Sequence, residues 1–393
     1  MTPAARISAA IEILDRIRDG DAAERVLTHW ARANRYAGSG DRAAIRDHVF
    51  DAVRCRRSFA WRGGADSGRG LMIGALRAAG VDPGTMFTGE KYAPAPLSEA
   101  ERLAPRIEDA PRGVRLDCPD WLLPHFDESL GAQTDAVLAA LQSRAPAFLR
   151  VNARLSTPAD VIAELSQLGV AARGHALSPT ALEVTENPRR VQTSAAYSEG
   201  RVELQDAASQ AVMDLIPIRN DVKILDYCAG GGGKSLALAA RADVRITAHD
   251  ANPQRMRDLP DRAARAGIGI VLAEGRSDLE PGGYDLVLCD VPCSGSGAWR
   301  RSPEAKWTLT AERLAELGQT QSAILEEALE FVAPGGTLAY ATCSMLTCEN
   351  RGLIDRLLAR HPDWSLTLER RLTPLDGGDG FYIALLTRAS IQY

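Results

Sequence analysis

Strand-like and helix-like segments alternate along the second half of this chain, and this alternation limits the fold more than any other feature. We expect strands at 222–227, 244–249, 268–273, 284–290, 337–342 and 381–386, with helices at 234–241, 253–266 and 311–332. Strands that alternate with helices predict parallel neighbours covered by helices on both faces. Residues 203–393 are therefore expected to form a doubly wound, mainly parallel, Rossmann-like α/β domain, with its ligands at the carboxyl ends of the strands.

The first 202 residues are expected to form two further parts. Apolar residues recur at helical spacing in residues 1–62, and this pattern with the Gly/Pro-rich stretch that follows predicts a helical region with a linker over 1–110. An expected strand at 148–152, followed by a helix that opens near Thr157, predicts a small α/β module over 117–202. A chain of 393 residues has room for these three parts.

Composition and charge exclude several classes of protein. With 45% hydrophobic and 25% charged residues, the chain has the balance of a soluble globular protein. It contains no apolar stretch of the roughly 18 residues that a membrane-spanning helix needs. An acidic residue as early as Glu12 and seven cysteines indicate a cytoplasmic protein with free thiols, and we expect a monomer with no membrane partner. The net charge is −5, but residues 1–62 hold twelve arginines against eight acids, which allows a local basic surface.

Four consecutive glycines connect the first strand of the expected sheet to its helix. Glycines let a ligand approach the backbone, and the start of a helix offers unpaired N–H groups. The loop, residues 228–234, has neither the Walker spacing nor a Gly-x-Gly-x-x-Gly pattern. Asp250 ends the next strand, sixteen residues beyond Lys234, where it is placed to bind ribose hydroxyls. These residues predict a site for a nucleoside-containing cofactor and leave a dinucleotide and S-adenosylmethionine both open.

Two cysteines follow the next strands of the same sheet. Cys293 stands three residues after Asp290, and Cys343 follows the strand at 337–342. Two thiols and a carboxylate at one sheet edge are typical of nucleophilic chemistry. Cys289, Cys293, Cys343 and Cys348 are the candidates for a four-thiolate zinc site, but their spacings are loose and Cys289 lies within an apolar strand, so we expect no metal.

Taken together, these motifs resemble those of the bacterial RNA cytosine-5 methyltransferases of the Nop2/Sun group. Within that group the chain is most similar to the small-subunit (16S) rRNA enzymes that have a NusB-like helical domain at the N-terminus. The resemblance covers about 117–388 and rests on residues 226–234, 290–294, 300–307, 340–344, 349–350 and 379–382. Gly230 and Gly231 replace the usual Ala-Pro, which predicts a more flexible cofactor loop, and the NusB-like region is shortened.

The resemblance implies S-adenosylmethionine-dependent methyl transfer to C5 of a cytosine in RNA, expected to be 16S rRNA, through a covalent bond between cysteine and C6. It implies Cys343 as the nucleophile and Cys293 as the thiol that assists product release; the sequence alone does not choose between them. Asp290 is expected on the N3/N4 edge of the cytosine, and Lys234 is expected to favour the thiolate. Two other functions stay open: a non-catalytic RNA-binding assembly factor and a tRNA methyltransferase. A nicotinamide-dependent dehydrogenase would leave both thiols unexplained.

The same resemblance implies how the cofactor and the RNA are held. The residues expected to contact the cofactor are Cys228, Ala229, Gly230, Gly231, Gly232, Gly233, Lys234, Asp250, Glu274 and Asp290. RNA is the expected partner, because a target base must leave its stack to react and RNA loops present unstacked bases. Two tryptophans and two arginines after Cys293 offer stacking and phosphate contacts, with core packing as the alternative for the tryptophans: Trp299, Arg300, Arg301 and Trp307.

Overall fold

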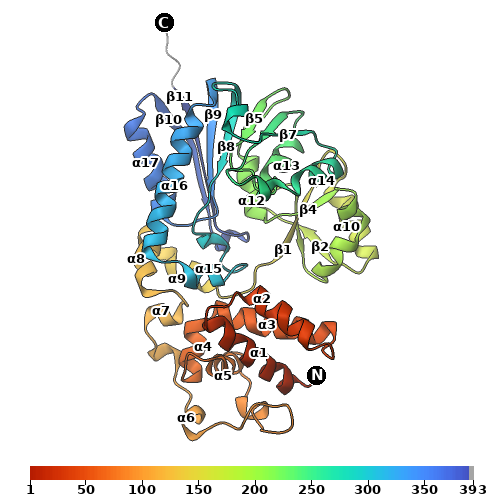
Figure 1. The fold of residues 1–393 in the computed structure, drawn as a ribbon, viewed down its shortest axis with the longest axis vertical. Coiled ribbons are helices and arrows are strands. Elements are labelled where there is room, and N and C mark those ends of the chain that lie inside the picture. The colour runs from red at the N-terminus through yellow and green to blue at the C-terminus, as the bar shows by residue number, and fades with distance from the viewer. Residues whose placement is uncertain (389–393) are drawn as a thin grey trace. The chain divides into compact units, whose positions relative to one another are not determined.

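The computed structural model describes residues 1–388 (Figure 1). Two compact units make up the chain. The first contains 1–144 together with 299–308, and the second contains 145–298 and the chain from 309 onward. This division differs from the expected domains, because residues 117–144 and 299–308 pack in the first unit. Among the described residues, no helix is long and apolar enough to cross a membrane.

A seven-stranded sheet forms the centre of the second unit, with strand order β10-β11-β9-β8-β5-β6-β7. Five of its strands are parallel, while β10 and β11 are antiparallel to their neighbours. This sheet confirms the predicted doubly wound, mainly parallel domain, although β10 was not predicted. The strands are β5 (Lys223–Asp226), β6 (Arg245–Ala248), β7 (Ile270–Leu272), β8 (Tyr284–Asp290), β9 (Val332–Thr342), β10 (Trp364–Leu372) and β11 (Phe381–Arg388).

Helices cover both faces of this sheet, because its central strands are apolar on both sides. In β8, Val287 and Cys289 belong to a core shared with α16 (Ala311–Leu329) and α17 (Arg351–Arg360). The intervening Leu286 and Leu288 belong to a second core shared with α12 (Ala207–Asp214) and α13 (Gly233–Ala239). A third cluster joins α14 (Leu259–Arg265) to the sheet.

A small antiparallel sheet precedes the large one in the second unit, in the region where the sequence predicted a small α/β module. Its strand order is β2-β3-β1-β4. Thr157 caps the N-terminus of its helix by accepting a hydrogen bond from the backbone N–H of Asp160. The elements are β1 (Ala147–Val151), α10 (Pro158–Gln167), β2 (Ala172–Gly174), β3 (Ala181–Val184), α11 (Ala195–Ser198) and β4 (Val202–Leu204).

The first unit is helical, which confirms the predicted N-terminal helical region. Its first five helices share one apolar core. The helices are α1 (Pro3–Arg18), α2 (Ala23–Ala33), α3 (Ser39–Arg54), α4 (Arg56–Gly63), α5 (Gly68–Ala78), α6 (Glu99–Arg102), α7 (Arg112–Arg115), α8 (Leu123–Leu130), α9 (Thr134–Ala140) and α15 (Glu304–Thr308).

Residues 299–308 belong to the first unit because their side chains bond to its backbone. The Lys306 ammonium, 2% exposed, donates to the carbonyl of Arg54 at 3.1 Å, and the Trp307 indole N–H donates to that of Val53 at 2.7 Å. Burial lowers the pKa of Lys306. The predicted stacking role of Trp299 is wrong in this structure: the side chain is 1% exposed and its ring packs edge-on against Phe126.

A buried carboxylate stabilises the same region of the first unit. Asp117 is fully buried and accepts from the backbone N–H of Ser58 at 2.9 Å, from the Ser58 hydroxyl at 2.6 Å and from the Gln142 amide at 2.9 Å. Burial raises the pKa of Asp117. Removing this acceptor would leave the buried Ser58 N–H without a partner, while the Ser58 hydroxyl and the Gln142 amide would keep only their bonds to the carbonyls of Cys55 and Arg115.

We expect Asp117→Ala to lower the free energy of unfolding of the first unit by at least about 2 kcal/mol, because a buried donor would be left unsatisfied. Urea unfolding, with hydrogen exchange of the α4 amides as the local readout, measures the loss. The matched control is Asp120→Ala, which removes an exposed ion pair with Arg57 and should cost less than about 1 kcal/mol. Equal, small losses in both variants would contradict the role given to Asp117.

Candidate active site

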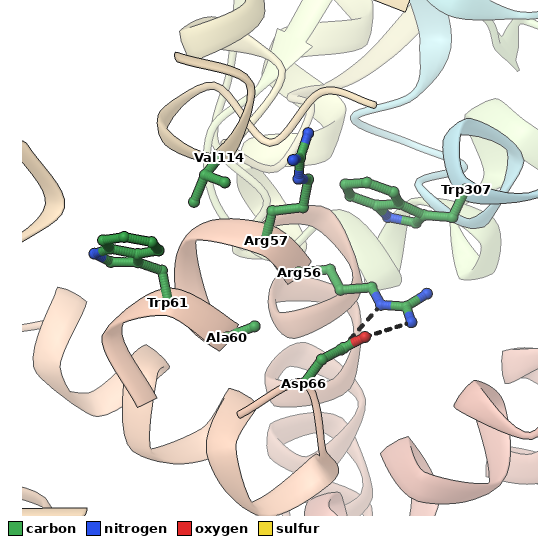
Figure 2. A pocket seen from close by; sticks show the side chains of 7 residues that line it. All are labelled: Arg56, Arg57, Ala60, Trp61, Asp66, Val114 and Trp307. Atoms are coloured by element: carbon green, nitrogen blue, oxygen red, sulfur yellow. Dashed lines mark hydrogen bonds and ion pairs between the residues drawn. The ribbon is translucent and has the colours of Figure 1, made fainter. Parts of the chain in front are cut away.

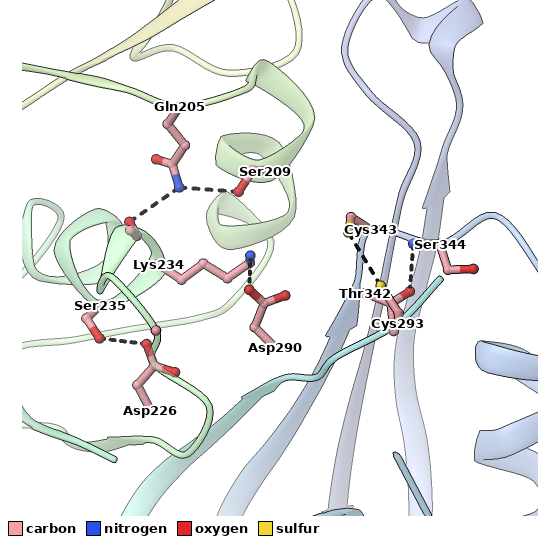
Figure 3. Close-up of polar contacts among 12 residues, drawn as sticks. Gln205, Ser209, Asp226, Lys234, Ser235, Asp290, Cys293, Thr342, Cys343 and Ser344 are labelled. Atoms are coloured by element: carbon pink, nitrogen blue, oxygen red, sulfur yellow. Dashed lines mark hydrogen bonds and ion pairs between the residues drawn. The ribbon is translucent and has the colours of Figure 1, made fainter. Parts of the chain in front are cut away.

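The parallel pairing of β8 and β9 brings Cys293 and Cys343 together. Asp290 at the end of β8 is the register partner of Ala341 in β9, so the two cysteines follow the same point of the sheet by three and two residues. Their sulfur atoms lie 3.4 Å apart, within hydrogen-bonding distance (Figure 3). Both side chains are partly exposed.

The surroundings of Cys293 disfavour its thiolate form. The hydrogen bond and charge of Cys343, burial, and the charge of Glu349 together raise the pKa of Cys293 well above its ordinary value. Cys293 is therefore held as a protonated thiol. A single thiolate next to a thiol donor is suited to nucleophilic attack on an electrophilic carbon.

Glu349 connects the segment that contains Cys293 to the segment that contains Cys343. Its carboxylate is 1% exposed and accepts from the Ser294 backbone N–H at 2.8 Å, and from the hydroxyl groups of Ser294 and Ser344. The Gln321 amide also donates to it at 3.0 Å. Each cysteine is thus followed by a serine that bonds to the same buried carboxylate. Sequence reasoning quoted Glu349 as part of a motif but gave it no role; an acidic residue six positions after Cys343 was the available signal.

A buried ion pair lies at the same edge of the sheet. The Lys234 ammonium donates to the Asp290 carboxylate, and it also lies 4.9 Å from the centre of the Phe381 ring. Burial alone would lower the pKa of Lys234, but the charges of Asp290 and Cys343 raise it above its ordinary value. Lys234 therefore stays protonated and fixes one oxygen of Asp290.

A polar cavity of about 310 Å³ opens beside this pair, within the size range of small-ligand sites. Asp226 lines it and is 1% exposed; one of its oxygens accepts from Ser235 at 2.6 Å, and the other has no partner. Burial raises the pKa of Asp226 to about 7. A buried oxygen without a partner at a cavity wall fits a ligand that donates a hydrogen bond. Predicted residues in the lining are Cys228, Ala229, Gly230, Gly231, Gly233, Lys234 and Asp290.

Three predicted cofactor residues lie outside this lining: Gly232 and the two acids Asp250 and Glu274. Asp250 is buried behind the glycine loop, where it accepts from the backbone N–H groups of Gly230 and Asn252, both at 2.9 Å, and pairs with Arg255 at 3.2 Å. Glu274 is exposed. The structure thus gives Asp250 a part in holding the loop, while the direct cofactor contacts expected of both acids stay predictions.

An arginine holds the glycine loop through a contact that the sequence did not predict. Arg262 donates to the carbonyl of Gly231 and pairs with the buried Glu203 of β4 at 2.9 Å. Gly230 and Gly232 have φ values of +51° and +75°, a region that favours glycine. The arginine therefore restrains a loop that the replacement of Ala-Pro by two glycines predicted to be more flexible.

We expect Arg262→Met to weaken the binding of S-adenosylmethionine, the cofactor expected from the sequence, about tenfold, the scale of one charge-assisted hydrogen bond. Calorimetry measures the affinity, and hydrogen exchange of residues 228–234 should become faster. Arg265→Met is the matched control, because Arg265 also pairs with Glu203 but has no bond to the loop carbonyl. Similar effects of the two variants would contradict a role for the bond to Gly231.

A metal site is not supported. Within residues 1–388, no group of three or more His, Cys, Asp or Glu side chains is placed to hold a metal ion. Cys289 is fully buried within β8. Of the other three candidates, Cys293 and Cys343 form the pair described above.

The sequence of this chain matches known protein families, and its fold matches a solved structure. Residues 212–387 match the family described as 16S rRNA methyltransferase RsmB/F, and residues 118–192 match the ferredoxin-like domain of RsmF/B-like methyltransferases. The solved structure of PH0851 has the same fold, with a TM-score of 0.78 over 98% of this chain and 99% of that one, at 22% identity.

Two curated relatives are ribosomal RNA small subunit methyltransferases B. The one from Citrobacter koseri is 34% identical over 284 residues, which are 69% of this chain and 66% of the relative. The one from Klebsiella pneumoniae strain 342 is 34% identical over 296 residues, 72% of this chain and 68% of the relative. The matched region thus spans about two thirds of these relatives. With its fold, its paired cysteines and these matches, the chain belongs to the RsmB/F family of 16S rRNA methyltransferases.

Proposed function

We propose that this protein transfers a methyl group from S-adenosylmethionine to C5 of a cytosine in 16S rRNA, through a covalent bond between Cys343 and C6. The observation that carries the proposal is the pair of thiols, 3.4 Å apart, at the edge of the sheet that also bears the polar cavity. The names of the relatives support ribosomal RNA as the substrate class.

The first step is addition of the Cys343 thiolate to C6 of the cytosine. An S–C6 bond forms, the C5=C6 double bond opens, and its electron pair makes C5 nucleophilic. The fixed carboxylate of Asp290 accepts a hydrogen bond from the exocyclic amino group and holds the ring in place. The raised pKa of Cys293 supports this assignment, because a protonated Cys293 is a poor nucleophile.

Product release uses the second thiol. Once Cys343 is bonded to carbon it no longer carries charge, so one of the causes of the raised pKa of Cys293 is removed. Cys293 then ionises more readily and takes the proton from C5. The C5–H electrons re-form the C5=C6 double bond, the S–C6 bond breaks, and Cys343 leaves as a thiolate. The pair thus divides attack and release between two neighbouring sulfur atoms.

The cavity residues fit S-adenosylmethionine, which when bound supplies an electrophilic methyl group on a sulfonium. Asp226 offers a buried oxygen without a partner to a donor group of the ligand. The glycine loop lets the ligand approach the backbone, and Arg262 and Asp250 hold that loop. Lys234, kept protonated by Asp290, orients the carboxylate that meets the target base.

The other candidate functions explain less of the site. A role as a non-catalytic assembly factor does not explain why two free thiols lie within hydrogen-bonding distance of each other. It also does not explain why the serine after each of them bonds to the same buried carboxylate. A dehydrogenase leaves the same residues unexplained. A tRNA substrate would use the same chemistry, and bisulfite sequencing of total RNA from a deletion strain distinguishes it by where the modified cytosine is lost.

We expect Cys343→Ala to abolish methyl transfer while S-adenosylmethionine still binds, because the covalent step is lost and the cavity is untouched. Incorporation of tritiated methyl groups into RNA measures the first property and calorimetry the second. Cys348→Ala, five residues further along, is the matched control and should retain activity. Substantial turnover by Cys343→Ala would overturn the assignment of the nucleophile.

A further inference from the structure

The first unit contains a cavity of about 380 Å³ that the catalytic proposal does not use (Figure 2). Arg56, Arg57 and Trp61 of α4 line it, together with Val114 and Asp66. Trp307 completes it from residues 299–308, the segment that joins this unit from between β8 and α16. Figure 2 shows the two indoles on opposite sides, with the arginines between them.

We propose that this cavity binds one unpaired nucleotide of the RNA substrate, with its base stacked on an indole and its phosphate at the arginines. The inference rests on the proposed function only in taking RNA as the substrate. Aromatic rings stack on any nucleobase, and arginine combines phosphate binding with stacking on planar groups. The volume lies within the range of small-ligand sites.

The two tryptophans are held in place before any ligand arrives. The indole N–H of Trp61 donates to the carbonyl of Arg106 at 3.0 Å, and that of Trp307 to the carbonyl of Val53 at 2.7 Å. Their polar atoms are therefore satisfied by the protein while the rings line the cavity. A platform fixed in this way loses little conformational entropy when a base stacks on it.

The charges around the cavity favour a polyanion over a neutral partner. Helix α4 contains three arginines and no acid, and two of these arginines line the cavity with Asp66 as its acid. Asp66 pairs with Arg56 and Asp120 with Arg57, both at 2.7 Å. Partly exposed pairs of this kind contribute less than about 1 kcal/mol each, so a phosphate can compete for the guanidinium groups.

The test uses the full chain and a fluorescein-labelled, single-stranded oligouridine RNA of about twelve nucleotides, long enough for one binding segment. Anisotropy should show Trp61→Ala weakening binding about 5- to 150-fold, the range for one lost base stack, while Trp61→Phe keeps most of the affinity. Tyr36→Ala is the matched control, since Tyr36 is an aromatic residue of the same unit, 73% exposed and outside the cavity lining. Its RNA affinity should be unchanged.

Salt dependence separates stacking from phosphate binding. Arg56→Gln should make the plot of log affinity against log salt less steep by about 0.7, the value for one phosphate contact on a single strand, while Trp61→Ala should leave the slope unchanged. Unaltered affinity for S-adenosylmethionine and an unaltered melting temperature show that both variants are folded.

One result would overturn the nucleotide site alone, and another would overturn the proposed function as well. If wild-type protein methylates RNA but Trp61→Ala binds the oligonucleotide as tightly as Tyr36→Ala does, the nucleotide site is overturned and the cavity is left for a protein partner. If the wild-type protein neither binds nor methylates RNA, the proposed function itself fails, and this inference fails with it.

Discussion

The parallel register between β8 and β9 is the constraint on which the rest of the site depends. It aligns Asp290 with Ala341, so that the segments leaving the two strands begin side by side. Glu349 then joins these segments through Ser294 and Ser344. A slip of one residue would turn every side chain of a strand to the opposite face, and the thiols would no longer meet.

In the proposed mechanism, this arrangement lets one pair of cysteines perform two different steps. Cys343 is one cause of the raised pKa of Cys293, and in the proposed mechanism the charge of Cys343 is lost when it bonds to carbon. Cys293 thereby becomes a better base after the nucleophile has reacted. At the same edge of the sheet, Lys234 donates a hydrogen bond to Asp290 and fixes the position of its carboxylate.

Sequence reasoning predicted the features that are local in the chain. The apolar strands, the glycine loop and the residues directly after β8 and β9 carry their own patterns, and parallel strands place their carboxyl ends at one edge. Features that depend on distant partners were not predictable. Arg262 and Glu349 act through side chains that meet only in the folded chain, and Trp299 became a core residue because it packs on Phe126. Strand β10 was missed because its run of charged residues, exposed at the edge of the sheet, obscures the strand pattern.

A denaturing gel of protein incubated with S-adenosylmethionine and RNA tests the division of labour between the thiols most directly. Cys293→Ala should add to cytosine and accept the methyl group, yet fail to release the product, so a covalent protein–RNA band should accumulate. Adding Cys343→Ala to that variant should remove the band. A band formed by Cys343→Ala alone and absent from Cys293→Ala would reverse the two roles and contradict the account.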